Sequence, residues 1–199
     1  MGAFLLLVLA AAGTPARASP ARAAASTAPP RVLVDRGACP FEGCAYGTWT
    51  AREDAALRSR PGGRATGVVV KKGERVRAIT GEVHVKPLRV VVRREIEVSG
   101  SLRLRAGDTY YLLTSLGEGF YTVWVRGAFA SLDPDFTWAG KGSCSESPGG
   151  CASEPEGGRE AFVRWTREGA VWWVKLRTAS GAFGWSSEPG KFDGKDLLE

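Results

Sequence analysis

The chain has 199 residues, of which 44% are hydrophobic and 24% charged, and its formal net charge is +6. Beyond the N-terminal residues no segment approaches about 18 consecutive apolar residues, which excludes a protein with several membrane-spanning helices. One histidine and four cysteines leave few ligands for a metal centre.

The N-terminus has the pattern of a secretory signal peptide. Its apolar run, "FLLLVLAAAG" at residues 4–13, is too short to cross ~30 Å of hydrocarbon as a helix. Small residues in A-x-A spacing follow, ending at Ala18 and again at Ala23. We therefore expect a signal peptide over residues 1–18, with cleavage as late as residue 25, and an exported protein, periplasmic or secreted. No Lys or Arg precedes the apolar run, so either the true start lies upstream or the terminal amine supplies the charge.

The stretch "GACPFEGCAYGTW" contains Cys39 and Cys44, and a turn-rich stretch contains Cys144 and Cys151. Cysteines of exported proteins usually pair, and four of them allow three connectivities. We favour the two local disulfides, Cys39–Cys44 and Cys144–Cys151. A zinc site usually needs more Cys or His ligands, and the C-x-x-C pattern of redox proteins is absent, so we expect neither metal nor cofactor.

Charge is distributed unevenly along the chain. Lys and Arg predominate between Arg58 and Arg105, whereas Asp and Glu predominate between Asp133 and Glu160. A basic region favours anionic partners. Because most of these bases alternate with apolar residues, we interpret them as the solvated face of β-strands and do not expect nucleic acid as a partner.

Residues 88–98, "LRVVVRREIEV", alternate with the period of two that is typical of half-buried strands. The residues predicted for the core face are Leu88, Val90, Val92, Ile96 and Val98. Arg94 interrupts the pattern and indicates a turn or a bulge, so the segment is one strand or a strand pair.

Three further segments have the pattern of two strands joined by a turn. The predicted turns are Lys72–Gly73, Gly117–Gly119 and Ala179–Ala182. In the strand that follows Gly169, Trp172 and Val174 share one face and Trp173 takes the other. No stretch shows the apolar spacing of a capped helix, so the sequence predicts an all-β protein.

A pattern of a basic residue, glycine, a charge and then β-forming residues recurs near Lys71, Leu104 and Arg167. Such recurrence indicates small β-barrels in tandem. The expected units after the signal peptide are 39–98 and 99–199, the second with a disulfide-tied loop at 133–158.

Two segments, "AALRSRPGGRATGVVVKKGERV" (55–76) and "WWVKLRTASGAFGW" (172–185), resemble the bacterial Src-homology-3-like (SH3-like) domains of exported proteins. The matching positions are Leu57, Arg58, Ser59, Pro61, Val68, Lys72, Gly73, Val76, Gly181, Gly184 and Trp185. Arg60 stands where the family usually has glycine. The resemblance implies two small SH3-like barrels, which in the family are mostly non-catalytic targeting or peptide-binding modules.

We therefore expect an exported, non-catalytic binding module whose ligand is a peptide, a cell-wall fragment or an envelope protein. The alternative is a cell-wall hydrolase that uses His84, the only histidine, with a carboxylate. No G-x-S-x-G or S-x-x-K pattern supplies a nucleophile, and the cysteines are expected to be paired. His84 is expected on a strand surface, and Asp133 and Asp135 in a turn without a catalytic role.

Seven tryptophans is a high number for this length. Tyr111, Tyr121 and Trp173 fall opposite the expected core faces. They either line a shallow ligand groove or fill the seam between the two barrels, and the sequence leaves both open.

Overall fold

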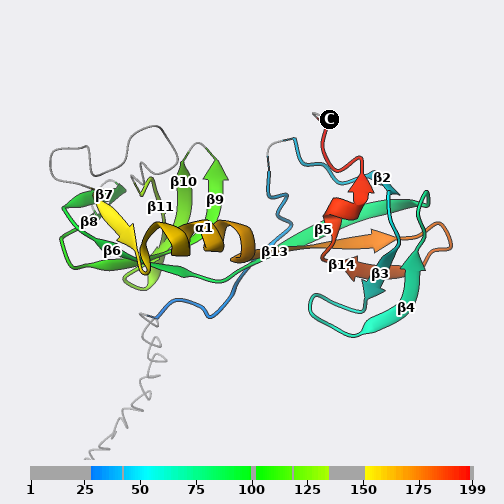
Figure 1. Cartoon of the computed structure of the whole chain (residues 1–199), viewed down its shortest axis with the longest axis horizontal. Coiled ribbons are helices and arrows are strands. Elements are labelled where there is room, and N and C mark those ends of the chain that lie inside the picture. Colours follow the sequence, from blue (N-terminus) through cyan, green and yellow to red (C-terminus); the bar gives the residue numbers. More distant parts are fainter. Residues whose placement is uncertain (1–27, 42, 100–101, 118, 135–150, 198–199) are drawn as a thin grey trace, which may run out of the picture.

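Figure 1 shows a computed structural model of the chain, which describes residues 28–41, 43–99, 102–117, 119–134 and 151–197. Strands predominate and form two groups, which lie side by side along the long axis of the molecule (Figure 1). None of the helices in these residues is long and apolar enough to cross a membrane. The signal peptide expected at residues 1–18 lies outside the described residues.

The first group is one eight-stranded antiparallel sheet that curls into a half-barrel, which we call the terminal sheet. Its strands, in spatial order, are β15 (Phe192–Asp193), β2 (Thr48–Ala51), β5 (Arg75–Val85), β13 (Ala170–Arg177), β14 (Phe183–Ser186), β3 (Ala55–Arg58) and β4 (Ala65–Val70). Strand β1 (Leu33–Arg36) pairs with the far end of β5, and a single 3-10 turn, η3 (Pro189–Lys191), precedes β15.

The concave side of the terminal sheet holds one hydrophobic core. Val174 and Leu176 of β13 are fully buried there and Trp172 packs against them, so the face predicted for this strand is confirmed. The same core contains Trp49 from β2 and Phe192 from β15, both 0% exposed. Burial of a side chain of this size stabilises the fold by about 2–3 kcal/mol, so residues from both ends of the chain hold one core together.

The second group is a five-stranded sheet, which we call the central sheet, with a separate hairpin and a helix. In spatial order its strands are β11 (Ala128–Leu132), β10 (Phe120–Val125), β9 (Thr109–Gly117), β6 (Leu88–Val92) and β12 (Ser153–Pro155). The hairpin pairs β7 (Ile96–Ser99) with β8 (Leu102–Leu104), and the helix is α1 (Gly158–Glu168). All five residues predicted for the core face of residues 88–98 lie in or against the core of this group. The segment forms two strands, and Arg94 lies in the bend between them.

The predicted predominance of β-strands is confirmed, but the described residues also contain one short α-helix, α1, that the sequence analysis did not predict. Phe162 and Trp165, one turn apart, pack against the core of the central sheet. The residue before the helix is Gly157, with a φ of 83°, and it has no side chain that could cap the helix. The sequence therefore lacks the Ser, Thr or Asp that usually marks a helix start. The helix has only eleven residues, so the i, i+3 spacing of its apolar residues does not recur often enough to identify a helix in the sequence.

The sequence placed a boundary between two units at residues 98 and 99, but the strand pairing divides the residues in another way. Strand β13 pairs with β5, and β15 pairs with β2, so the last part of the chain completes the terminal sheet. The central sheet and α1 come from the residues between β5 and β13. Both segments that resemble SH3-like domains therefore lie in one sheet, where Trp185 pairs with Arg58. The structure does not confirm two barrels in tandem.

Candidate functional site

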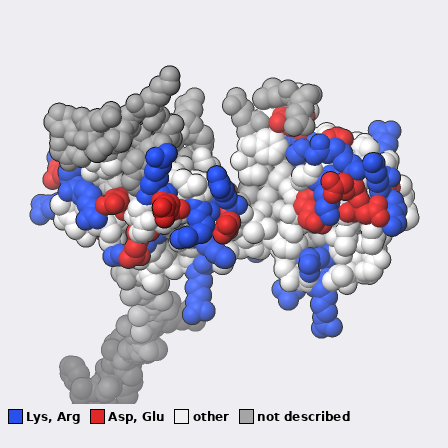
Figure 2. Space-filling view, viewed as in Figure 1, with Lys and Arg blue, Asp and Glu red and all other residues white. Residues whose placement is uncertain are grey.

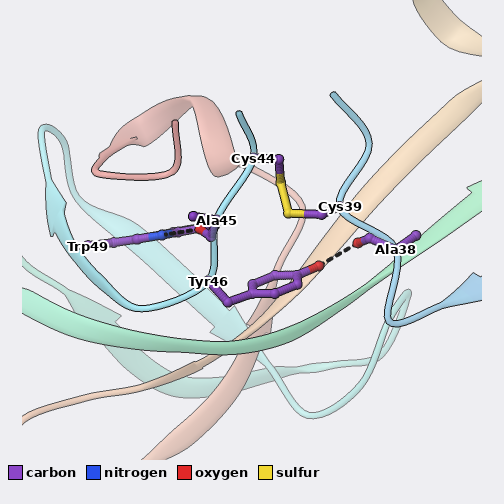
Figure 3. The surroundings of a disulfide bond; sticks show 6 residues. All are labelled: Ala38, Cys39, Cys44, Ala45, Tyr46 and Trp49. Atoms are coloured by element: carbon purple, nitrogen blue, oxygen red, sulfur yellow. Dashed lines mark hydrogen bonds between the residues drawn. A yellow bond between two sulfur atoms is a disulfide. The ribbon is translucent and has the colours of Figure 1, made fainter. Parts of the chain in front are cut away.

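The loop between β1 and β2 is closed by a disulfide between Cys39 and Cys44, as predicted, with Cα atoms 5.6 Å apart (Figure 3). Inside the loop, the Tyr46 hydroxyl donates a hydrogen bond to the carbonyl of Ala38. Burial raises the pKa of Tyr46, so this hydroxyl stays protonated at neutral pH. The disulfide therefore closes this loop beside the hydrogen bond between Tyr46 and Ala38.

Aromatic packing attaches this loop to the core of the terminal sheet. Phe41 lies between the two cysteines, and its ring meets Trp172 edge-on with centroids 5.7 Å apart. Trp172 in turn lies 5.8 Å from Trp49, whose indole N–H donates to the carbonyl of Ala45 at 3.0 Å. The position of Phe41 is thus set by the core, although the residue is 37% exposed.

A cleft of about 920 Å³ lies where the two sheets meet. Val83, Val85 and Leu113 line it and are at most 5% exposed. Phe41 and Leu116 line it from more exposed positions, the latter 58% exposed. Figure 2 shows that the side of the terminal sheet that faces the gap is mostly uncharged. The cleft therefore has an apolar floor, and its rim combines apolar side chains with polar ones such as Asp35 and Thr166.

One wall of the cleft is the part of β9 that extends beyond its pairing with β6. Strand β6 pairs with β9 only as far as Leu112, and residues 113–116 of β9 line the cleft. Among the described strands, β6 is the partner of β9 on this side and its pairing ends at Leu112, although Ser115 further along β9 has another interaction. Figure 1 shows β9 as the strand of the central sheet nearest the gap. An open edge presents backbone N–H and C=O groups that an extended chain can pair with.

Tyr121 and Trp165 line the cleft on the side of the central sheet. Their ring centroids are 6.1 Å apart, and the Trp165 indole N–H donates to the carbonyl of Lys86 at 2.7 Å. This hydrogen bond attaches α1 to the segment between β5 and β6. Burial raises the pKa of Tyr121, so its phenol is neutral at physiological pH.

The structure does not bring the three predicted aromatic residues together. Tyr121 packs on the core of the central sheet and borders the cleft. Tyr111 lies between Tyr110 and Leu112, which are both buried, so it points to the opposite face of that sheet. Trp173 lies in the terminal sheet and is 9% exposed. Of the three, Tyr121 alone contributes to the cleft.

His84 lies on the outer face of β5, as expected for a strand-surface residue. Its Nε2 is 3.0 Å from Oε2 of Glu82, which also pairs with Arg36 at 3.6 Å. No hydrogen bond between His84 and a hydroxyl or thiol is found in the described ranges. Asp133 is exposed and Asp135 lies outside them. No group of three potential metal ligands occurs in the same ranges.

The second predicted disulfide falls partly outside the described residues, because Cys144 and most of the loop 133–158 are not described. No cysteine that the structure describes is free. The Cys144–Cys151 pairing stays a prediction.

Comparison of the chain with protein-family models, curated proteins and solved structures finds no match. Most residues of the cleft were missed by the sequence analysis, among them Phe41, Leu116 and Trp165. Phe41 could have been predicted from the sequence, because an aromatic residue inside a short disulfide loop is held at the surface. Trp165 could have been found together with Phe162, because the two aromatic residues have the i, i+3 spacing of one helix face.

Proposed function

We propose that the protein is an exported, non-catalytic SH3-like binding module whose ligand is an extended peptide, free or carried by a cell-wall fragment or an envelope protein. The observation that supports this most is the cleft, which combines an apolar floor with the part of β9 that extends beyond its pairing with β6. A peptide added beside residues 113–116 pairs its backbone with β9 and directs alternate side chains toward that floor.

The size and place of the cleft fit a binding site. About 920 Å³ is within the ~300–1,000 Å³ usual for ligand sites, which often lie between structural units. The floor is already buried in the free protein, so little reorganisation opposes binding.

The other parts of the proposal rest on the sequence. The N-terminal pattern and the Cys39–Cys44 disulfide support export, since disulfides persist in oxidising compartments. The two SH3-like segments support the fold family, and their meeting at Trp185 and Arg58 in one sheet fits a single SH3-like unit interrupted by the central sheet.

A displayed library of random peptides about ten residues long tests the proposal. Peptides enriched on the wild-type protein should bind the Leu116→Asp variant at least tenfold more weakly, because the new carboxylate loses water when a peptide covers it. The matched control is Leu197→Asp, since Leu197 is 76% exposed and does not line the cleft. Purified wall sacculi serve as a competing ligand. The absence of any enriched peptide, or equal binding by both variants, would overturn the proposal.

The His84–Glu82 contact favours one second candidate, hydrolysis of wall material. In that case the wild-type protein releases soluble fragments from sacculi and the His84→Ala variant does not. The binding proposal predicts no release by either protein.

A further inference from the structure

The outer face of the terminal sheet gathers cations and aromatic rings from four adjacent strands. In β13 the side chains alternate, so Lys175 and Arg177 point away from the core that buries Val174 and Leu176. The register then extends this set across the sheet. Arg177 lies opposite Arg77 on one side and Phe183 on the other, and Trp185 lies between Lys175 and Arg58. We call this set the cationic face: Arg58, Arg77, Lys175, Arg177, Phe183 and Trp185.

Among the cations of the cationic face, Arg58 donates a hydrogen bond to the carbonyl of Gly63 at 2.9 Å, but carboxylate partners are lacking in the described residues. None of its four cations takes part in the ion pairs found among the described residues, whereas Lys71 and Arg52 of the same unit pair with Asp54 and Asp193. Arg77 and Arg177 are direct cross-strand partners. Like charges in that position destabilise a sheet. An arrangement that weakens the fold is expected where an anionic ligand compensates it.

The aromatic ring of Phe183 holds two of these cations in place. Lys175 Nζ lies 5.8 Å and Arg177 Cζ 5.5 Å from its centroid, distances typical of cation–π contacts. Phe183 is 51% exposed and Arg177 is exposed as well, whereas Lys175 is partly buried. Because the ring already carries cations, it is a poor platform for stacking of nucleic-acid bases, which needs a free aromatic surface.

A peptide is also a poor fit for this surface. Strands β5, β13, β14 and β3 are neighbours in the interior of the sheet, so each has a strand on both sides. A peptide finds no backbone edge to pair with there, unlike at β9. What remains is a set of cations spaced by the strand separation of ~4.8 Å and the two-residue repeat of ~6.6 Å.

From this geometry we propose that the cationic face binds a linear polymer whose units are joined by phosphodiesters and carry no bases. Guanidinium groups bind phosphate oxygens through paired N–H donors, and a flexible phosphodiester chain brings successive charges to the neighbouring cations. The surface lies on the convex side of the sheet and shares no residue with the lining of the cleft. The proposal therefore stands independently of peptide binding.

Fluorescence anisotropy with labelled poly(glycerol phosphate) tests this, using the full chain at physiological salt. The Arg77→Gln/Arg177→Gln double variant should bind at least tenfold more weakly, and the slope of log affinity against log salt should fall by about two. The control is Arg159→Gln/Arg164→Gln on α1, which makes the same change in net charge at exposed arginines of the other unit and should keep affinity within twofold. The first variant should melt no lower than wild type, because it removes a like-charge pair.

Three results would each overturn the proposal. The first is equal weakening by both double variants, which indicates an effect of net charge alone. The second is tighter binding of an oligothymidylate with the same number of phosphates, which indicates base stacking. The third is equal binding of poly-glutamate, which shows that phosphate is not selected.

Discussion

Leu176→Ala tests whether the last strands of the chain belong to the same core as the first. Leu176 is fully buried in β13, in one core with Trp49 and Val76. The substitution removes three methylene-sized groups, a loss of about 2.4 kcal/mol at ~0.8 kcal/mol each. A cavity that collapses only partly raises the total to about 3–4 kcal/mol.

Urea unfolding followed by tryptophan fluorescence gives the change in the free energy of unfolding, and hydrogen exchange shows where it acts. We expect faster exchange at the amides of Trp49 and Val76, far from residue 176 in sequence. The control is Leu112→Ala, equally buried in the other core, which should destabilise the central sheet by a similar amount. If Leu176→Ala speeds exchange only within residues 170–186 and leaves β2 unchanged, the reasoning fails.

Three further predictions concern covalent and ionisable groups. Replacing both Cys39 and Cys44 with serine should lower the free energy of unfolding by about 2 kcal/mol, measured in urea, because the closed loop is short. Burial raises the pKa of Tyr110, so folding favours its neutral form. The contribution of this neutral phenol to the free energy of unfolding is fully present below pH ~10 and is lost as the pH rises further. Tyr110→Phe should therefore lose less stability than wild type between pH ~9 and ~11, and an equal loss contradicts the assignment. The hydrogen bond from Lys71 lowers the pKa of Asp54, so its contribution is present above pH ~4 and disappears as the pH falls. In acid titrations the stability difference between wild type and Asp54→Asn should shrink below pH ~3, and a constant difference counts against the pairing.

Features set by neighbouring residues were predictable from the sequence. The alternation in residues 88–98 identified the buried face because the side-chain direction in a strand is a local property. The turn at Gly73, where φ is 82°, was predictable because glycine adopts this conformation without strain. The Cys39–Cys44 disulfide followed from proximity along the chain.

Features set by distant residues were not predictable in the same way. Any exposed strand of suitable pattern can pair with β5, and nothing local to Arg77 specifies β13 as its partner. Tyr111 pairs with Trp124, whereas Tyr121 lies two residues before Val123 on the face that packs in the core, and two register shifts between β9 and β10 make these partners hard to derive from the sequence. The cleft depends on both effects, so its residues were found only in the structure.

The pairing of Val85 with Ala170 has a consequence for the order of folding. The residues between them form their own core, largely through contacts within that segment, so they can fold before the terminal sheet is complete. Once folded, they hold the end of β5 beside the start of β13. The entropy cost of closing the loop between Val85 and Ala170 is then part of the folding of the central sheet and does not oppose the pairing of β5 with β13. Without this arrangement, strands β2 to β5 would keep unpaired edges exposed until β13 to β15, which are synthesised last, could pair with them. The inserted sheet thereby acts as an internal template for the sheet that surrounds its two ends.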